Sequence, residues 1–167
     1  MDREEDFAAY AAARWATLVR SAVFLGCGLE EAQDLVQTTL LRCFTAWGRV
    51  ERADNRDAYV YRVLLNCHRD SRRRRWWGER PTPDLGQHPT ADATDQVAIG
   101  DAVERALGDL SRVNREVVVL RYYGRLSEQQ TAAVLGIPAG TVKSRLSRAL
   151  ALLSANPHLA DLAEGTS

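Results

Sequence analysis

Apolar residues recur with helical spacing along most of the chain. The most regular stretch has members three or four residues apart: Ala32, Leu35, Val36, Thr39, Leu40, Cys43, Phe44 and Trp47. Three consecutive valines at 117–119 would suit a strand, but Leu110, Val113, Val117 and Leu120 keep the helical period. The pattern therefore predicts an all-α fold with helices over 3–25, 30–48, 56–77, 97–108 and 112–123, followed by a further pair.

The segment from Gly78 to Gln96 interrupts this pattern. It contains three prolines, a single leucine and no aromatic residue. Such a segment buries too little apolar surface to offset the entropy lost on ordering. The sequence thus predicts two small helical domains, 1–77 and 97–153, joined by a flexible acidic linker over 78–96, with a C-terminal tail over 154–167.

Residues 126–153 have the pattern of a helix-turn-helix. Ser127 and Gln130 have the spacing of a capping box, and Gly136 suits the left-handed end of a short helix. In the second helix, the side expected to pack inward is apolar: Val142, Leu146, Ala149, Leu150 and Leu153. The outward side carries short hydrogen-bonding groups and long cations: Lys143, Ser144, Arg145, Ser147 and Arg148. These side chains suit a helix that lies in the major groove of DNA, which makes this the candidate base-reading face.

The helix predicted over 30–48 has an unusual outer face. Leu41 lies there among polar side chains, namely Asp34, Thr38 and Thr45, with Gln37 and Arg42 at the edges. A large apolar residue in such surroundings is typical of a binding hot spot. A lone exposed leucine is also common and often has no function.

The helix predicted over 56–77 carries a basic face opposite its apolar side. Its members are Arg62, Asn66, Arg69, Arg73 and Trp76, close to the arginine run 72–75. Cations with an amide and an aromatic ring suit DNA phosphates and an unstacked base. Arginines at a helix C-terminus are also favoured by the helix dipole alone. Charge by itself leaves both interpretations open.

The formal net charge of zero hides an uneven distribution. Residues 1–77 carry thirteen basic and eleven acidic side chains, and residues 98–153 carry eight and five. Both predicted domains are thus slightly basic, and local patches would have to bind nucleic acid. The acidic start and the absence of a long apolar run indicate a cytoplasmic protein with no membrane partner.

The cysteines and histidines give little sign of catalysis. Cys27, Cys43 and Cys67 form no CxxC pair, and His68, His88 and His158 are scattered. Cys43 and Cys67 fall in apolar stripes and are expected in the core, which leaves Cys27, in a Gly-Cys-Gly turn, as a minor candidate for redox sensing. No metal triad, phosphate loop or nucleophile with its base stands out. We therefore expect no enzyme activity, no metal and no cofactor.

Three stretches together resemble one family, the extracytoplasmic-function group of bacterial RNA polymerase sigma factors. The region 2 helix that grips the polymerase is similar to EEAQDLVQTTLLRCFTAW, and the part that reads and melts the −10 element is similar to NRDAYVYRVLLNCHRDSRRRR. Region 4, which reads the −35 element, resembles LSRVNREVVVLRYYGRLSEQQTAAVLGIPAGTVKSRLSRAL. The resemblance implies a sigma factor whose partners are the clamp and flap of core RNA polymerase, promoter DNA and an anti-sigma factor.

The resemblance also implies roles for individual residues. The polymerase clamp would contact Asp34, Gln37, Thr38, Leu41 and Arg42. The loop Asp54, Asn55, Arg56 and Asp57, with Asn66 beneath it, would hold a flipped −10 base, and the adjacent backbone would meet Arg62, Arg69 and Arg73. The −35 duplex would meet Lys143, Ser144, Arg145, Ser147 and Arg148. The chain departs from the family at Thr38, where an acidic residue is common, and at Ser111, where proline is usual.

Two other classes compete with this interpretation. A free-standing helix-turn-helix regulator, with a sensing or dimerising first domain, would bind duplex DNA without polymerase. A thiol or metal enzyme is the other competitor, and the placement of the cysteines argues against it.

Overall fold

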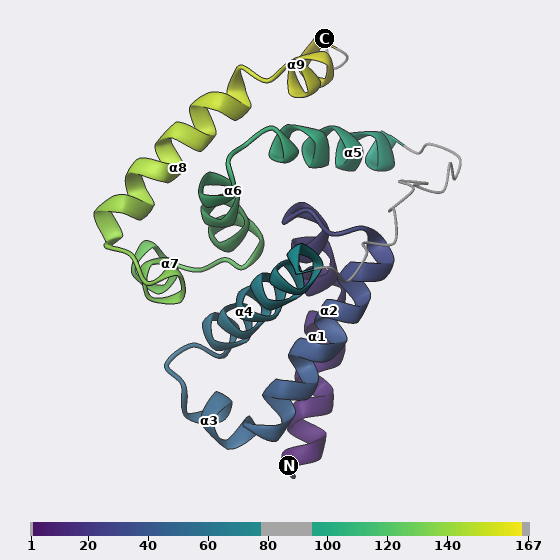
Figure 1. Cartoon of the computed structure of the whole chain (residues 1–167), viewed down its shortest axis with the longest axis vertical. Coiled ribbons are helices and arrows are strands. Elements are labelled where there is room, and N and C mark those ends of the chain that lie inside the picture. The colour runs from purple at the N-terminus through teal and green to yellow at the C-terminus, as the bar shows by residue number, and fades with distance from the viewer. Residues whose placement is uncertain (1, 78–94, 165–167) are drawn as a thin grey trace.

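The chain folds into helices, as the sequence predicts. The computed structural model describes residues 2–77 and 95–164, and within these ranges it contains no strand (Figure 1). The first helical unit consists of α1 (Arg3–Phe24), α2 (Leu29–Thr45), α3 (Trp47–Arg52) and α4 (Arg56–Trp76). The second helical unit consists of α5 (Asp95–Gly108), α6 (Arg112–Val118), the π-helical turn η1 (Val119–Tyr123), α7 (Glu128–Leu135), α8 (Ala139–Ser154) and α9 (Pro157–Glu164). The predicted linker lies outside the described residues, except that α5 already begins at Asp95.

In the first unit, α2 packs between α1 and α4. Asp2 and Glu5 form a capping box at the start of α1, and Asn55 caps α4. The helix predicted over 30–48 ends at Thr45, and α3 begins at Trp47. The short break accompanies full burial of the Trp47 indole, which packs against the rings of Phe7 and Tyr10 on α1. Cys43 and Cys67 are buried, which confirms their predicted place in the core.

The second unit contains the predicted helix-turn-helix. Ser127 and Gln130 form the reciprocal capping box of α7, and Gly136 ends that helix with φ +67°. Ser111 caps α6 by accepting a hydrogen bond from the amide of Asn114, so serine at this position starts the helix as a cap.

Two details of the second unit differ from the prediction. Leu150 is exposed, although it was expected on the inward side of α8. It lies at the margin of the apolar stripe, where the position of the neighbouring helix decides burial. The segment expected to be a tail contains α9, which packs on α5.

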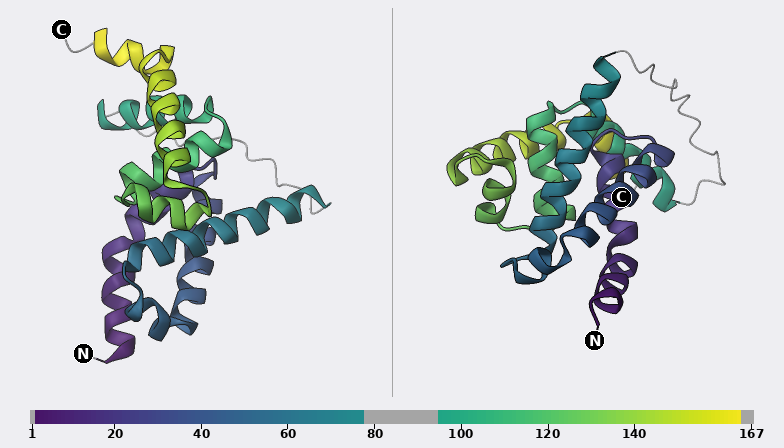
Figure 2. Two further views of the ribbon diagram at one scale, coloured as in Figure 1. Left: turned by 90° about the vertical axis from the view of Figure 1, so that its left-hand side faces the viewer. Right: turned by 60° about the horizontal axis from the view of Figure 1, so that its bottom comes forward.

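The two units share one hydrophobic core. Buried side chains of α1, α2 and α4 form a continuous cluster with Leu107, Leu110, Val119 and Leu120 of the second unit. The rings of Phe24 and Tyr123 lie 4.6 Å apart across the contact. Further views show α7 lying against α4 (Figure 2). Tyr61, Leu65 and His68 of α4 are buried as well.

Candidate nucleic-acid and partner interfaces

The outer face of α2 forms one wall of an apolar groove. The groove has a volume of about 800 Å³ and lies between α1 and α2. Gln37, Thr38 and Leu41 line it, and the Leu41 side chain is 65% exposed. Asp34 is exposed on the same helix but does not line the groove, and Arg42 forms an ion pair with Asp70 of α4. The structure thus brings together three of the five predicted polymerase contacts.

The opposite wall of this α1–α2 groove comes from α1, which the sequence interpretation missed. It consists of Glu4 and three apolar residues, Phe7, Ala11 and Trp15. The three apolar residues follow one another at intervals of four, which places them on one face of a helix. This apolar helix face could have been recognised from the spacing in the sequence. The partly exposed ring of Trp15 and the side chain of Leu41 make the groove a strong candidate for binding a partner helix.

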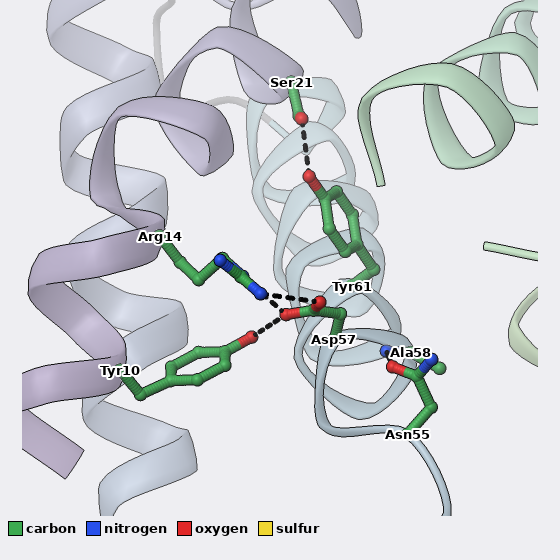
Figure 3. A network of polar contacts seen from close by, with 7 residues as sticks. All are labelled: Tyr10, Arg14, Ser21, Asn55, Asp57, Ala58 and Tyr61. Carbon is green, nitrogen blue, oxygen red and sulfur yellow. Dashed lines mark hydrogen bonds and ion pairs between the residues drawn. The ribbon is translucent and has the colours of Figure 1, made fainter. Parts of the chain in front are cut away.

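The loop that precedes α4 is tied to α1 (Figure 3). Asn55 Oδ1 accepts a hydrogen bond from the Ala58 amide at 3.0 Å, which uses this side chain as the helix cap. Asp57 Oδ1 accepts hydrogen bonds from the Tyr10 hydroxyl at 2.6 Å and from Arg14 Nε at 3.0 Å. Two of the residues predicted to line the base pocket therefore have structural contacts within the protein.

Arg56 also turns towards α1. Its Nη1 lies 3.3 Å from Asp6 Oδ1, and its guanidinium lies 5.7 Å from the centre of the Trp47 ring. Asp54, the remaining member of the predicted loop, is exposed. Of the four loop side chains, Asp54 is thus the most available to a DNA base.

The structure separates Asn66 from this loop, contrary to the single pocket that was expected. Asn66 follows Asn55 by eleven residues on a continuous helix. At 1.5 Å per residue the two positions are about 16 Å apart, which is too far for both to contact one base. Asn66 lies instead on an exposed line with Arg62 and Arg73. A base pocket at the loop and a contact at Asn66 would be two separate sites.

Arg69, also predicted to meet the DNA backbone, faces the second unit. Its Nη2 lies 3.1 Å from Glu116 Oε2 on α6, and the Glu116 side chain is only 5% exposed. Arg112 approaches the other oxygen of this carboxylate at 3.9 Å. Arg69 therefore neutralises a buried carboxylate in this arrangement.

The recognition face of α8 is exposed as predicted. Lys143, Ser144, Ser147 and Arg148 point away from the protein, and Arg145 is partly exposed. Val142 and Ala149, on the opposite side, are fully buried. The helix-turn-helix thus presents one polar, basic face of a firmly packed helix.

Cys27 lies in a setting that disfavours redox chemistry. Its side chain is buried, with Sγ 3.6 Å from Nδ1 of His68. Burial raises the pKa of the Cys27 thiol to about 12, so the reactive thiolate is scarce at neutral pH. Among the described residues, no cluster of three or more potential metal ligands occurs, and no helix is long and apolar enough to span a membrane.

Comparisons with known proteins agree with this geometry. Residues 7–78 match the family model "Sigma-70 region 2", and residues 100–153 match "Sigma-70, region 4". The RNA polymerase sigma-E factor of Streptomyces coelicolor is 42% identical over 148 residues, which cover 89% of this chain and 84% of that protein. The ECF RNA polymerase sigma factor SigL of Mycobacterium tuberculosis is 36% identical and covers 83% of this chain and 81% of its own length.

Two solved structures share the arrangement of the whole chain. The sigma factor RpoE of Bartonella quintana, in complex with the anti-sigma factor NepR, matches with a TM-score of 0.72 at 27% identity, over 90% of this chain and 96% of RpoE. CnrH, in complex with the cytosolic domain of CnrY, matches with a TM-score of 0.68 at 26% identity, over 95% of this chain and 90% of the other. With its region 2 match, its region 4 match and its relatives over nearly the full length, the chain belongs to the extracytoplasmic-function group of RNA polymerase sigma factors, which direct promoter-specific transcription.

Proposed function

We propose that this sigma factor reads the −35 element with the exposed face of α8. The observation that carries the proposal is the division of α8 into a buried side, with Val142 and Ala149, and an exposed side that holds two cations and two hydroxyls. Short hydroxyls allow close approach to a groove, while Arg148 and Lys143 reach base edges or phosphates. The residues assigned to this reader are Lys143, Ser144, Arg145, Ser147 and Arg148.

We assign the −10 element to the first unit, in two parts. The loop 54–57 would take an unstacked base, chiefly through Asp54 and the loop backbone. The exposed line of Arg62, Asn66 and Arg73 on α4 would follow the DNA backbone, and Arg69 would join it once separated from Glu116. The division follows from the distance of about 16 Å between the loop and Asn66.

The α1–α2 groove is the proposed site for the polymerase clamp. Leu41 and Trp15 offer apolar anchors from opposite walls, and Gln37 and Thr38 supply polar contacts at the rim. Asp34 and Arg42 would add contacts beside it. Binding there would make the protein a regulatory subunit of the polymerase with no catalytic step of its own. It would act in the cytoplasm, where the polymerase and its promoters are. An anti-sigma factor is a further proposed partner, since the matched RpoE structure is described as a complex with the anti-sigma factor NepR.

Reading both elements at once requires the two units to separate. The −35 and −10 elements lie about 25 base pairs apart, or about 85 Å along B-form DNA. A compact chain of this length is only roughly 40–50 Å across. The 18 residues between α4 and α5 can span at most about 65 Å, which allows the readers to reach their sites after the shared core has opened.

Reconstituted transcription tests the proposed function. Core RNA polymerase with the full chain should start transcription from promoters selected out of a random-sequence library, and core polymerase alone should not. The selected promoters should share two conserved blocks at a fixed spacing. Sequence-specific binding of the chain to duplex DNA, with no transcription in the presence of core polymerase, would instead favour a free-standing regulator.

A further inference from the structure

Three polar residues form a stripe along α1 that faces the −10 loop. Asp6, Tyr10 and Arg14 follow one another at intervals of four residues, so they lie on one side of the helix. None of the three belongs to the stretches that resemble promoter-reading segments. All three nevertheless bond to residues at or beside the loop 54–57.

Asp6 joins the two sides of the loop. Its Oδ2 accepts a hydrogen bond from Trp47 Nε1 at 3.0 Å, and its Oδ1 accepts one from Arg56 Nη1 at 3.3 Å. Trp47 opens the short helix before the loop, and Arg56 opens the helix after it. The bond from Trp47 lowers the pKa of Asp6, so the carboxylate stays charged near neutral pH.

Tyr10 and Arg14 hold the loop from the other end. The Tyr10 hydroxyl donates to Asp57 at 2.6 Å, and Arg14 donates to both oxygens of the same carboxylate, at 3.0 and 3.3 Å (Figure 3). Burial of the Tyr10 ring raises the pKa of its hydroxyl, which therefore remains a donor at any physiological pH. These bonds fix the first turn of α4 at the point where the loop enters it.

We propose that the stripe of Asp6, Tyr10 and Arg14 is a positioning device that holds the −10 loop in its base-accepting shape without contacting DNA. This inference rests on the proposed −10 role of the loop. A loop that must accept an extruded base binds it more tightly when its shape exists beforehand, because no ordering entropy is then lost on binding. Asp57 acts in this scheme as the anchor of the loop, and Asp54 remains free for the base.

The test measures base preference at the −10 element with holoenzyme containing the full chain. Promoters with each of the four bases at every −10 position are compared by permanganate detection of open complexes. Tyr10→Phe removes one hydrogen bond but keeps the ring that packs on Trp47, and Arg14→Gln removes the ion pair. Each variant should lower discrimination between the preferred base and the others by about threefold to tenfold, the equivalent of one lost hydrogen bond.

Two further measurements separate positioning from general damage. Affinity for core polymerase and for the −35 element should stay within about twofold of the unmodified protein, because α8 and the groove are untouched. Arg20→Gln, which removes an exposed charge from the same helix away from the stripe, serves as the matched control. The proposal would be overturned if Tyr10→Phe and Arg14→Gln lowered −10 discrimination, core polymerase affinity and −35 affinity equally. Unchanged −10 discrimination in both variants would also overturn it.

A double variant tests whether Asp57 acts through the stripe. If Asp57 is an anchor only, Asp57→Asn combined with Arg14→Gln should lose no more discrimination than the worse single variant, within about twofold. A clearly larger loss would mean that Asp57 contacts the base itself, against the proposal. Asp54→Ala tests the underlying assignment of the loop. If this variant leaves the base preference at −10 unchanged, the loop does not read the base. If it changes the preference while Tyr10→Phe and Arg14→Gln do not, only the positioning role is refuted.

Discussion

Arg69 of α4 and Glu116 of α6 form an ion pair of 3.1 Å across the contact between the two helical units. The Glu116 side chain is 5% exposed, while that of Arg69 is 37% exposed. A nearly buried carboxylate needs such a partner, since an unpaired charge in that place would be strongly unfavourable. The pair therefore stabilises an arrangement in which Arg69, a proposed DNA-binding residue, is bonded to Glu116 within the protein.

Replacing Glu116 should weaken the contact between the units. Glu116→Gln keeps an acceptor for Arg69 but removes the charge that Arg69 and Arg112 share. We expect the free energy of unfolding in urea to fall by about 1–2 kcal/mol, a discounted value because Arg69 is partly exposed. Glu30→Gln, at the exposed start of α2, should cause a smaller change. Similar losses in both variants would show that the pair contributes nothing specific.

His68 should make stability depend on pH. Burial, followed by the charges of Arg72 and Arg115, lowers the pKa of His68 to about 4, against 6.5 for a free histidine. Between these values the unfolded chain binds a proton and the folded chain does not, so stability is full above pH 6.5 and is lost as the pH falls towards 4. The loss should reach about 3 kcal/mol at most.

Denaturation curves between pH 4 and 7 check this expectation. His68→Gln should flatten the curve of stability against pH in that range, although it changes stability at pH 7 as well. His158→Gln is the matched control, since that side chain is 42% exposed. An unchanged pH dependence in the His68 variant would mean that other groups cause the acid sensitivity.

Leu41 should be an anchor for polymerase. Leu41→Asp places a charge on the wall of the α1–α2 groove and should weaken binding to core polymerase by about 2 kcal/mol or more, roughly thirtyfold. Leu29 is also exposed on α2 but does not line the groove, so Leu29→Asp should bind normally. Fluorescence titration of labelled protein with core polymerase measures both. Equal affinity for the two variants would remove Leu41 from the interface.

Arg148 should contribute to −35 recognition. Arg148→Ala should weaken promoter binding by the holoenzyme by about 1–3 kcal/mol. A loss confined to one −35 position would indicate contact with a guanine edge, and a loss uniform across sequences would indicate a phosphate contact. Arg105→Ala removes an exposed arginine of α5 as the control. If both variants bind every −35 sequence normally, the reading face of α8 is wrongly assigned.

Asn66 and Asp54 should act independently. Because about 16 Å separates the loop from Asn66, the effects of Asp54→Ala and Asn66→Ala on open-complex formation should add within about 0.5 kcal/mol. Each alone should cost about 1–3 kcal/mol if it removes a contact to DNA. Strong non-additivity would restore the single pocket that the sequence suggested.

Local patterns in the sequence predicted the helices and several of their ends. Ser127, Gln130 and Gly136 act on residues within one turn, so their spacing alone identified the capping box and the end of α7. The same holds for the exposed face of α8, since helical geometry sets which residues share a side. The π-helical turn at 119–123 and the break at Ala46 had no such local signal.

The candidate sites were predictable only as far as a helix face is defined by spacing. Leu41, Thr38 and Gln37 were found on that basis, and the partner wall with Trp15 could have been found in the same way. What the loop residues do was not predictable. Arg56 and Asp57 bond to residues of α1 that precede them by 43 to 50 positions, and no local pattern encodes such a pairing.

The sequence by itself determined the all-α fold, the helix-turn-helix and the outward faces of α2 and α8, because helix formation and capping depend on neighbours three or four residues away. Tertiary structure alone decided that Arg69 meets Glu116, that Tyr61, Leu65 and His68 are buried, and that Asp57 anchors a loop. These outcomes depend on which surfaces pack together. Packing between α4 and the second unit brings together residues nearly fifty positions apart in the sequence. No local sequence pattern indicates that such residues will be in contact.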